Sequence, residues 1–341
     1  MIRLITSEPN IRYLSGFTGS IAILILTDKD ALLIVDGRYT QQARSEAKKG
    51  IKVIETPLSS SLLDTAMNII KAKKISAIGY EDDKMDAASF NKLKDRFPNL
   101  KFNSISKELR DKRMIKNKDE IDALKKAALI ADLTYDCVVR IIKPGMTELE
   151  ISANIDYMMK TFRGNAPAFE TLVSSGKLSA YPHGKPTEKK LEKGDVIVMD
   201  FGVRYKGYNS DITRMASLGT PSKKHRILYD AVIHAHEAAI SKVRAGVAAK
   251  DVDKAARDTL KKKELEKYFR HGTGHGIGLQ VHEGPRVSLS SKDILKEGMV
   301  ITIEPGVYIP GVGGFRVEDM VLVKKGGCEV LTKSSKELAV L

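Results

Sequence analysis

Two stretches of the sequence place an acidic residue at the end of an apolar run, where an unpaired carboxylate is costly. Residues 191–202 read LEKGDVIVMDFG, and their apolar run ends in Asp200. Residues 295–306 read LKEGMVITIEPG and repeat the pattern in register, with Glu304 in the place of Asp200. Such runs predict buried strands, and a buried carboxylate needs a partner that compensates its charge. The repetition indicates a site that both strands share.

Each of these acids is followed by a second acid on the return strand of a predicted hairpin. With a turn near residues 205–206, Asp211 is expected opposite Asp200. With a second turn centred near residue 311, Glu318 is expected opposite Glu304. Residues paired across two strands lie about 5 Å apart at Cβ. Four converging carboxylates repel one another, so we expect that some are protonated or that cations bind them.

Three histidines lie between the two pairs of acids. Residues 271–283 read HGTGHGIGLQVHE and contain His271, His275 and His282 among glycines that permit close backbone approach. Four carboxylates and one imidazole form a mostly hard ligand set, and two divalent ions would balance the four charges. This set favours Mn²⁺ or Co²⁺, with Fe²⁺ or Zn²⁺ as alternatives. Two such ions can lower the pKa of a shared water and polarise a carbonyl.

The elements that carry these residues are predicted to be duplicated. A helix over 118–142 precedes KPGMTELE, where Thr147 and Glu150 form a capping box for the next helix, which runs to about residue 162. A helix over 223–243 likewise precedes RAGVAAKD and a further helix over 251–263. Each pair of helices is followed by a strand that ends in an acid. Residues 113–341 are therefore expected to form an α+β domain with an internal pseudo-two-fold duplication.

Residues 1–112 show a different pattern, in which strand and helix signals alternate. Two apolar runs around an Asp-Lys-Asp turn predict a hairpin, and helices are predicted over 39–49, 62–73 and 86–96. This alternation is typical of a smaller α/β domain. The charged segment 106–117 has a weak apolar period and is expected to be the linker.

Composition limits the classes of function that fit the chain. The 341 residues carry a net charge of +14, but the lysines are interleaved with acids and no nucleic-acid-binding motif is present. The sequence offers no secretory signal and no apolar run long enough to span a bilayer. Its two cysteines suggest no disulfide framework. We expect a cytoplasmic protein without nucleic-acid or membrane partners.

Five motifs, in this order and spacing, resemble those of the pita-bread metallopeptidases: VMDFG, NSDITR, HGTGHGIG, ITIEPG and RVED. That family includes proline dipeptidases, Xaa-Pro aminopeptidases, methionine aminopeptidases and creatinase. NIRYLSGFTGS and VDGRYTQQA are similar to the creatinase-type N-terminal domain of the Xaa-Pro peptidases. The resemblance implies a pita-bread catalytic domain after a smaller creatinase-type domain. Family members often begin with an amphipathic helix, which we expect to be absent here or encoded upstream.

The resemblance also implies roles for individual residues. Glu304 would take a proton from the attacking water, His183 would stabilise the tetrahedral intermediate, and His282 would contact the substrate near the scissile bond. His271 would be a third histidine of the active site. Two further residues would lie behind the ligands or beside the substrate, namely Tyr308 and Arg316. The implied metal ligands are Asp200, Asp211, His275, Glu304 and Glu318.

The N-terminal domain points to the Xaa-Pro branch of the family. A prolyl amide carries no N–H, so a protease that binds this group fails on it, whereas two metals can orient the amine and carbonyl instead. The resemblance implies a homodimeric Xaa-Pro aminopeptidase that acts through a metal-bridging hydroxide on peptides with proline at the second position. A dipeptidase restricted to Xaa-Pro dipeptides is the alternative. A non-catalytic protein that binds histones or RNA is a third hypothesis, against which the complete ligand set argues.

Overall fold

The computed structural model describes residues 1–341. The chain divides into two compact units, Met1–Arg113 and Met114–Leu341, called here the N-terminal and C-terminal units. Each unit has hydrophobic clusters of its own. None of the helices combines the length and the apolar character needed to cross a bilayer.

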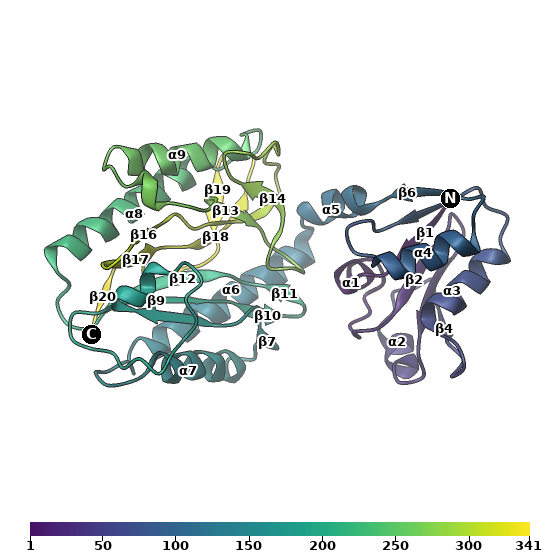
Figure 1. The fold of residues 1–341 in the computed structure, drawn as a ribbon, viewed down its shortest axis with the longest axis horizontal. Helices are drawn as coiled ribbons and strands as arrows, with labels where there is room; N and C mark the ends of the chain where they lie inside the picture. The colour runs from purple at the N-terminus through teal and green to yellow at the C-terminus, as the bar shows by residue number, and fades with distance from the viewer. The chain divides into compact units, whose positions relative to one another are not determined.

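The N-terminal unit is built on one six-stranded sheet with the order β4-β3-β2-β1-β5-β6 (Figure 1). The predicted hairpin is confirmed, because β2 and β3 pair antiparallel on either side of the Asp-Lys-Asp turn. Strands β1 and β2 are also antiparallel, and the pairs β1–β5, β3–β4 and β5–β6 are parallel. The strands are β1 (Ile2–Ile5), β2 (Ile23–Leu26), β3 (Ala31–Val35), β4 (Ile51–Glu55), β5 (Ala77–Tyr80) and β6 (Lys101–Ser104).

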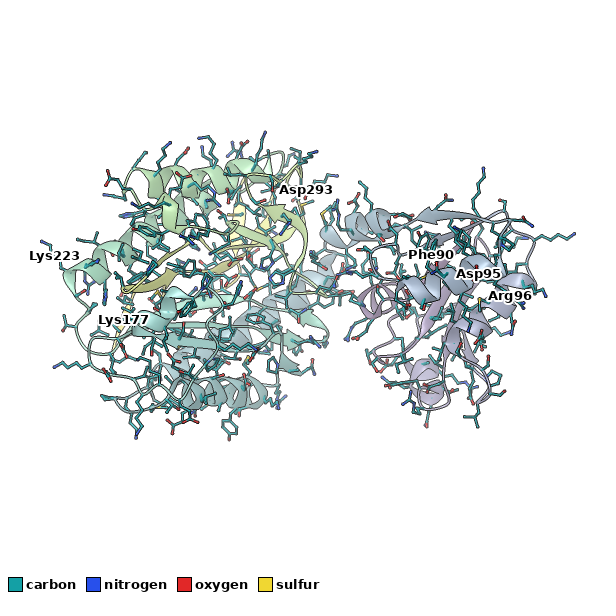
Figure 2. All side chains as sticks on the ribbon, viewed as in Figure 1. Phe90, Asp95, Arg96, Lys177, Lys223 and Asp293 are labelled. Atoms are coloured by element: carbon teal, nitrogen blue, oxygen red, sulfur yellow. The ribbon has the colours of Figure 1, made fainter.

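Helices cover both faces of this sheet, and its inner strands β2 and β3 are accordingly apolar along their whole length. On one face the strands pack against α3 (Leu62–Lys71) and α4 (Ala87–Arg96). On the other face they pack against α1 (Glu8–Ser15), α2 (Thr40–Glu46) and α5 (Ser106–Met114). Phe90 of α4 stacks on Tyr80 with ring centroids 4.8 Å apart. Asp95 and Arg96, at the end of the same helix, are exposed (Figure 2).

The segment 106–117, expected to be the linker, contains the division between the two units after Arg113, but most of it is helical. Residues Ser106–Met114 form helix α5. The charged residues conceal a narrow apolar stripe, since Leu109 and the preceding Ile105 are buried against the sheet at a helical spacing of four. A stripe this narrow gives only a weak helix signal in the sequence, and packing against the sheet determines that the segment is helical.

The C-terminal unit contains two helix pairs on opposite sides of its strands (Figure 1). Helices α6 (Lys118–Val138) and α7 (Glu148–Thr161) confirm the first predicted pair, with α6 ending four residues early. Both begin with a capping box, and that of α7 joins Thr147 and Glu150 as predicted. The second pair is α8 (Lys223–Lys242) and α9 (Ala249–Lys261).

After each helix pair comes an antiparallel strand pair that continues into a hairpin. In the first half, β9 pairs with β12, and β10 pairs with β11 at the tip. In the second half, β15 pairs with β18, and β16 pairs with β17 at the tip. The predicted duplication is confirmed by this order of elements. The strands are β9 (Val196–Phe201), β10 (Val203–Tyr205), β11 (Tyr208–Asn209), β12 (Ile212–Ser217), β15 (Val300–Ile303), β16 (Gly306–Ile309), β17 (Gly313–Arg316) and β18 (Asp319–Val323).

Shorter strands complete the C-terminal unit. The first half extends to the sheet β20-β12-β9-β8, with β7 beside β10, and the second half to the sheet β14-β13-β15-β18-β19. Lysines such as Lys177 and Lys223 are exposed on the surface of this unit (Figure 2). These strands are β7 (Ala166–Pro167), β8 (Leu172–Ser175), β13 (Gly274–Gly276), β14 (Glu283–Val287), β19 (Cys328–Val330) and β20 (Ala339–Val340).

The predicted register is wrong for the first hairpin and fits the second. Asp200 pairs with Thr213, two residues beyond Asp211. The turn is Lys206-Gly207, and both residues adopt positive φ, as a two-residue hairpin turn requires. Moving the turn centre by one residue moves the partner by two, so Asp211 stays on the same face as Asp200. In the second hairpin Gly306 pairs with Arg316, a register that continues to Glu304 and Glu318.

The capping box of α7 generates a first prediction. The Thr147 hydroxyl accepts from the backbone N–H of Glu150 at 3.1 Å, so Thr147→Ala leaves that N–H without its partner. We expect a loss of about 1 kcal/mol in the free energy of unfolding of the C-terminal unit. Calorimetric or urea unfolding measures it. Thr161→Ala, at the exposed other end of the same helix, is the control and should change stability by less than about 0.5 kcal/mol.

Candidate metal centre

The four acids are brought together at the ends of the two strand pairs. Asp200 lies near the end of β9 and Asp211 immediately before β12, while Glu304 follows β15 and Glu318 precedes β18. The two halves meet directly here, because the Glu318 backbone N–H donates to the Thr213 carbonyl at 3.2 Å. The Thr213 hydroxyl also donates to Glu318 Oε2 at 2.8 Å.

Three of the predicted ligands form a tight cluster. One ligand atom each from Asp211, His275 and Glu318 lies within 4.8 Å of the others. His275 Nε2 is 3.6 Å from Asp211 Oδ2 and 3.4 Å from Glu304 Oε1. The other ring nitrogen, Nδ1, lies 3.0 Å from the Gly276 carbonyl, which can only accept. Nδ1 therefore carries the proton, and Nε2 presents a lone pair to the acids.

The glycines on either side of His275 are required by close packing. A side chain at Gly274 would collide with the backbone of Thr302, and one at Gly276 would collide with the carbonyl of Gly284. Strand β13 thus lies between β14 and β15 at a separation that only glycine permits. This packing fixes the imidazole beside the acids.

Asp200 stands beside the cluster and is held by an arginine. Its Oδ2 accepts from the guanidinium of Arg316, whereas its Oδ1 is buried and has no hydrogen-bond partner. A buried carboxylate oxygen without a partner is rare in folded proteins. A cation at this position would supply the missing interaction.

The charges at the site point to the same conclusion. Burial, together with the neighbouring carboxylates, raises the pKa of Asp211 and Glu318 well above their ordinary values. Burial also raises the pKa of Glu304. The pKa of His275 is lowered by burial, so its imidazole is neutral. Acids that resist ionisation, one neutral imidazole and an orphaned oxygen fit a centre built for divalent cations.

Behind the acids, Arg316, Tyr308 and His271 form a chain of hydrogen bonds. Arg316 donates to the Thr213 hydroxyl at 2.9 Å and to the Tyr308 hydroxyl at 2.7 Å. Tyr308 lies 3.0 Å from His271 Nε2, while His271 Nδ1 lies 2.8 Å from the Gly272 carbonyl, so Tyr308 donates to Nε2. Burial lowers the pKa of His271 and raises that of Tyr308 to about 12. Arg316 thus links Asp200, Glu318 and His271.

Two predicted histidines lie on the open side of the site. The His282 ring lies 4.3 Å from the His275 ring, and its residue is exposed. His183 is exposed on a loop whose Pro182 carbonyl accepts from Arg316 at 3.2 Å. Burial and the nearby His275 lower the pKa of His282. Both imidazoles are therefore accessible to a bound molecule.

Sequence reasoning missed a buried carboxylate that fixes the histidine loop of the second half. Asp253 accepts from both the backbone N–H and the hydroxyl of Thr273 at 2.9 Å. Its partner Arg257, one turn along α9, donates to the His271 carbonyl at 2.5 Å. The Thr273 carbonyl in turn accepts from the Glu304 N–H at 2.7 Å. The sequence signal was the spacing of Asp253 and Arg257, four residues apart on one helix face.

The first half has an analogous device. Glu148, at the first turn of α7, is fully buried and accepts from the backbone N–H and the hydroxyl of Ser175. It also accepts from the N–H and hydroxyl of Thr187. These two residues bracket the loop that carries His183. In each half, one buried acid on the second helix therefore anchors a loop with a histidine.

A duplicated α+β unit with buried acids around one imidazole defines the pita-bread class of metal-dependent enzymes. Comparison with known proteins gives the same result, because residues 122–325 match metallopeptidase family M24 and residues 2–115 match the creatinase/prolidase N-terminal domain. The chain belongs to metallopeptidase family M24 and is a metallo-exopeptidase of that family. The expected fold, a creatinase-type domain followed by a pita-bread domain, is confirmed.

Individual relatives match the chain over nearly its whole length. A solved X-Pro aminopeptidase from Thermotoga maritima is 38% identical with a TM-score of 0.93, and the match covers 100% of this chain and 97% of that chain. An Xaa-Pro dipeptidase structure from Bacillus anthracis is 37% identical with a TM-score of 0.95, covering 100% and 95%. An Xaa-Pro dipeptidase of Pyrococcus horikoshii is 36% identical over 336 residues, covering 98% and 93%.

The raised pKa of Glu318 predicts how metal-free protein responds to pH. The folded state binds this proton more tightly than the unfolded chain, so the carboxyl favours folding at low pH. That contribution is lost as the pH rises above the ordinary value of about 4.3 and through the raised pKa. Metal-free Glu318→Gln protein should therefore melt at a higher temperature than wild type at neutral pH, and the difference should shrink towards about pH 4.

Melting curves in a chelating buffer, recorded across this pH range, measure that difference. Glu329→Gln, which changes an acid whose pKa is lowered by its hydrogen bond to Lys125, is the control and should not show a rising advantage with pH. A melting-temperature difference between Glu318→Gln and wild type that does not depend on pH would contradict the prediction.

Proposed function

We propose that the chain hydrolyses the Xaa-Pro bond at the N-terminus of peptides, with residues 1–112 as the creatinase-type domain and residues 113–341 as the catalytic domain. The observation that carries this proposal is the buried cluster of Asp211, His275 and Glu318, flanked by Asp200 and Glu304 in a family M24 fold. These five residues would hold two divalent ions, for which we propose Mn²⁺ or Co²⁺. When bound, the ions would polarise the scissile carbonyl and acidify a water.

Glu304 is the acid best placed to accept the proton of that water. Its side chain is 20% exposed, compared with 7% for Asp211 and 13% for Asp200, so it faces the open side of the site. Its backbone is anchored by the Thr273 carbonyl, which holds the carboxylate beside His275. A carboxylate with a raised pKa is a better base near neutral pH than an ordinary one.

The exposed imidazoles would contact the substrate. His183 would donate a hydrogen bond to the oxyanion that develops on the scissile carbonyl, and His282 would contact the peptide next to that bond. Arg316 and Tyr308 would keep Asp200 and His271 in place, through the hydrogen bonds described above. None of these roles needs an N–H on the scissile amide, which suits a prolyl substrate.

The names of the relatives support cleavage of an Xaa-Pro bond and are consistent with two lengths of substrate, a dipeptide or a longer peptide. One solved relative is named an X-Pro aminopeptidase. This name supports the proposal that the chain acts on peptides with proline at the second position. Other relatives are Xaa-Pro dipeptidases, which favours restriction to dipeptides as the second candidate. We propose the aminopeptidase activity first and a homodimer as the functional assembly.

An assay of substrate length tests the proposal. Wild-type protein loaded with Mn²⁺ or Co²⁺ should release the first residue from both an Xaa-Pro dipeptide and a longer Xaa-Pro peptide, as measured by product analysis. Matched peptides with alanine in place of proline are the control and should react far more slowly. Cleavage of the dipeptide alone would favour the dipeptidase. No hydrolysis of either peptide, by protein shown to contain two metals per chain, would overturn the proposal.

Two substitutions should inactivate the enzyme by different routes. Asp200→Ala removes a proposed ligand, so the bound metal and the turnover should both fall. His183→Ala removes a group that holds no metal, so kcat should fall by about 10²–10⁴-fold while the metal content is unchanged. Metal analysis alongside steady-state kinetics separates the two. Full metal content in Asp200→Ala would exclude Asp200 from the centre, and loss of metal in His183→Ala would contradict the role given to that residue.

A further inference from the structure

A second charged cluster lies directly behind the bridge between the two halves. Arg214 follows Thr213 and Asp319 follows Glu318, and both side chains are fully buried and joined by an ion pair of 2.7 Å. Successive side chains of a strand point to opposite faces. Arg214 and Asp319 therefore face away from the acids of the metal centre, although each is the immediate neighbour of a residue in the bridge.

Arg214 binds the backbone of both halves at once. One terminal nitrogen donates to the Thr213 carbonyl at 3.0 Å and to the Glu318 carbonyl at 2.6 Å. The other donates to Asp319 Oδ1 at 2.7 Å and to the Ser334 carbonyl at 3.1 Å. A guanidinium has a rigid planar fork, so it fixes the spacing of the carbonyls that it binds. Arg214 therefore holds strands β12 and β18 together next to Glu318, whose side chain belongs to the metal centre.

The C-terminal segment 332–336 covers this cluster. The Thr332 hydroxyl donates to Asp319 Oδ1 at 2.6 Å, and Lys336 Nζ lies 3.3 Å from Asp319 Oδ2. His236 Nε2 lies 3.2 Å from the same oxygen on the side of α8. The segment is itself fastened to α6, because the N–H of Ser334 donates to Asp132 at 2.8 Å.

The composition of the cluster argues for positioning more than for stability. Replacing a buried ion pair by apolar residues of similar volume is often neutral or stabilising, so burial of these charges adds little to the free energy of folding. What the pair supplies is a fixed geometry, since the arginine fork donates to the carbonyls of Thr213, Glu318 and Ser334, and an apolar side chain would donate to none of them.

We propose that Arg214 and Asp319, closed over by residues 332–336, are positioning residues of the metal centre that set its affinity for divalent ions. They act through the backbone of Thr213 and Glu318 and touch neither metal nor substrate. The inference rests on the proposed function, because it takes Glu318 to be a ligand. Supporting groups around metal ligands typically change metal affinity by about 10–100-fold when they are altered.

The test measures Mn²⁺ binding to metal-free full-length protein by calorimetry, with folding checked by circular dichroism and melting temperature. Arg214→Lys keeps the charge and loses the fork, and we expect its Kd for Mn²⁺ to rise at least about tenfold. Excess Mn²⁺ should restore kcat, and KM for the peptide should stay near the wild-type value. A purely structural role would instead lower the melting temperature and leave Kd unchanged.

A second variant keeps the test decisive if Arg214→Lys does not fold. Lys336→Met alters a side chain that is 36% exposed and touches Asp319, and its Kd should rise by a smaller factor, about twofold to tenfold. Lys125→Met alters a lysine of comparable exposure, 41%, which pairs with Glu329 outside this cluster, and is the matched control with unchanged Kd.

The outcomes separate this inference from the proposed function. Wild-type protein that binds no Mn²⁺ and cleaves no Xaa-Pro peptide would overturn the proposed function and this inference with it. Wild-type protein that binds two ions, together with folded Arg214→Lys or Lys336→Met protein of unchanged Kd, would overturn the positioning role alone. Weakened binding in these variants, with the Lys125→Met control unaffected, would support it.

Discussion

The structure depends on one electrostatic constraint: several carboxylates are buried within a few ångströms of one another. Without compensation they cannot all ionise, which is why the pKa values of Asp211 and Glu318 rise. Only Asp200 has a cationic partner within the protein, since Arg316 binds one of its oxygens. The remaining acids are either protonated or bound by cations, and the surrounding elements hold them close together although their mutual repulsion opposes folding.

Much of this centre could be predicted because the residues and the elements that carry them are encoded locally. An apolar run that ends in an acid predicts both a strand and the position of the acid at its end. The glycine-rich turn around residue 311 was sufficient to place Glu318 opposite Glu304. In the first hairpin the turn includes Lys206, a residue without the freedom of glycine that nevertheless adopts positive φ. The strand pairing imposes that conformation on Lys206. The predicted turn was therefore centred one residue too early, and the predicted partner of Asp200 was Asp211 in place of Thr213.

The parts that sequence reasoning missed depend on contacts between distant segments. Asp253 binds Thr273 and Arg214 binds Asp319, and neither pair has a spacing that a single sequence makes visible. His236 illustrates the limit, because it lies on helix α8 outside any motif and nothing in the sequence shows its partner. The structure places it fully buried beside Asp319. Helix α5 was missed for the same reason, since its apolar stripe becomes evident only against the sheet that it covers.

The bridge between Thr213 and Glu318, where the two halves meet, has an implication for how such a molecule can arise. Neither half contains all five proposed ligands, because each contributes two acids and only the second contributes His275. In a chain containing one half alone, Thr213 or Glu318 would keep the strand pairing of its own half and lose only the contact with the other half. A separate chain containing only one half of the C-terminal unit would need a second chain to complete the proposed site. In one continuous chain the two halves are always present together, so completing the site does not depend on the concentration of a second chain.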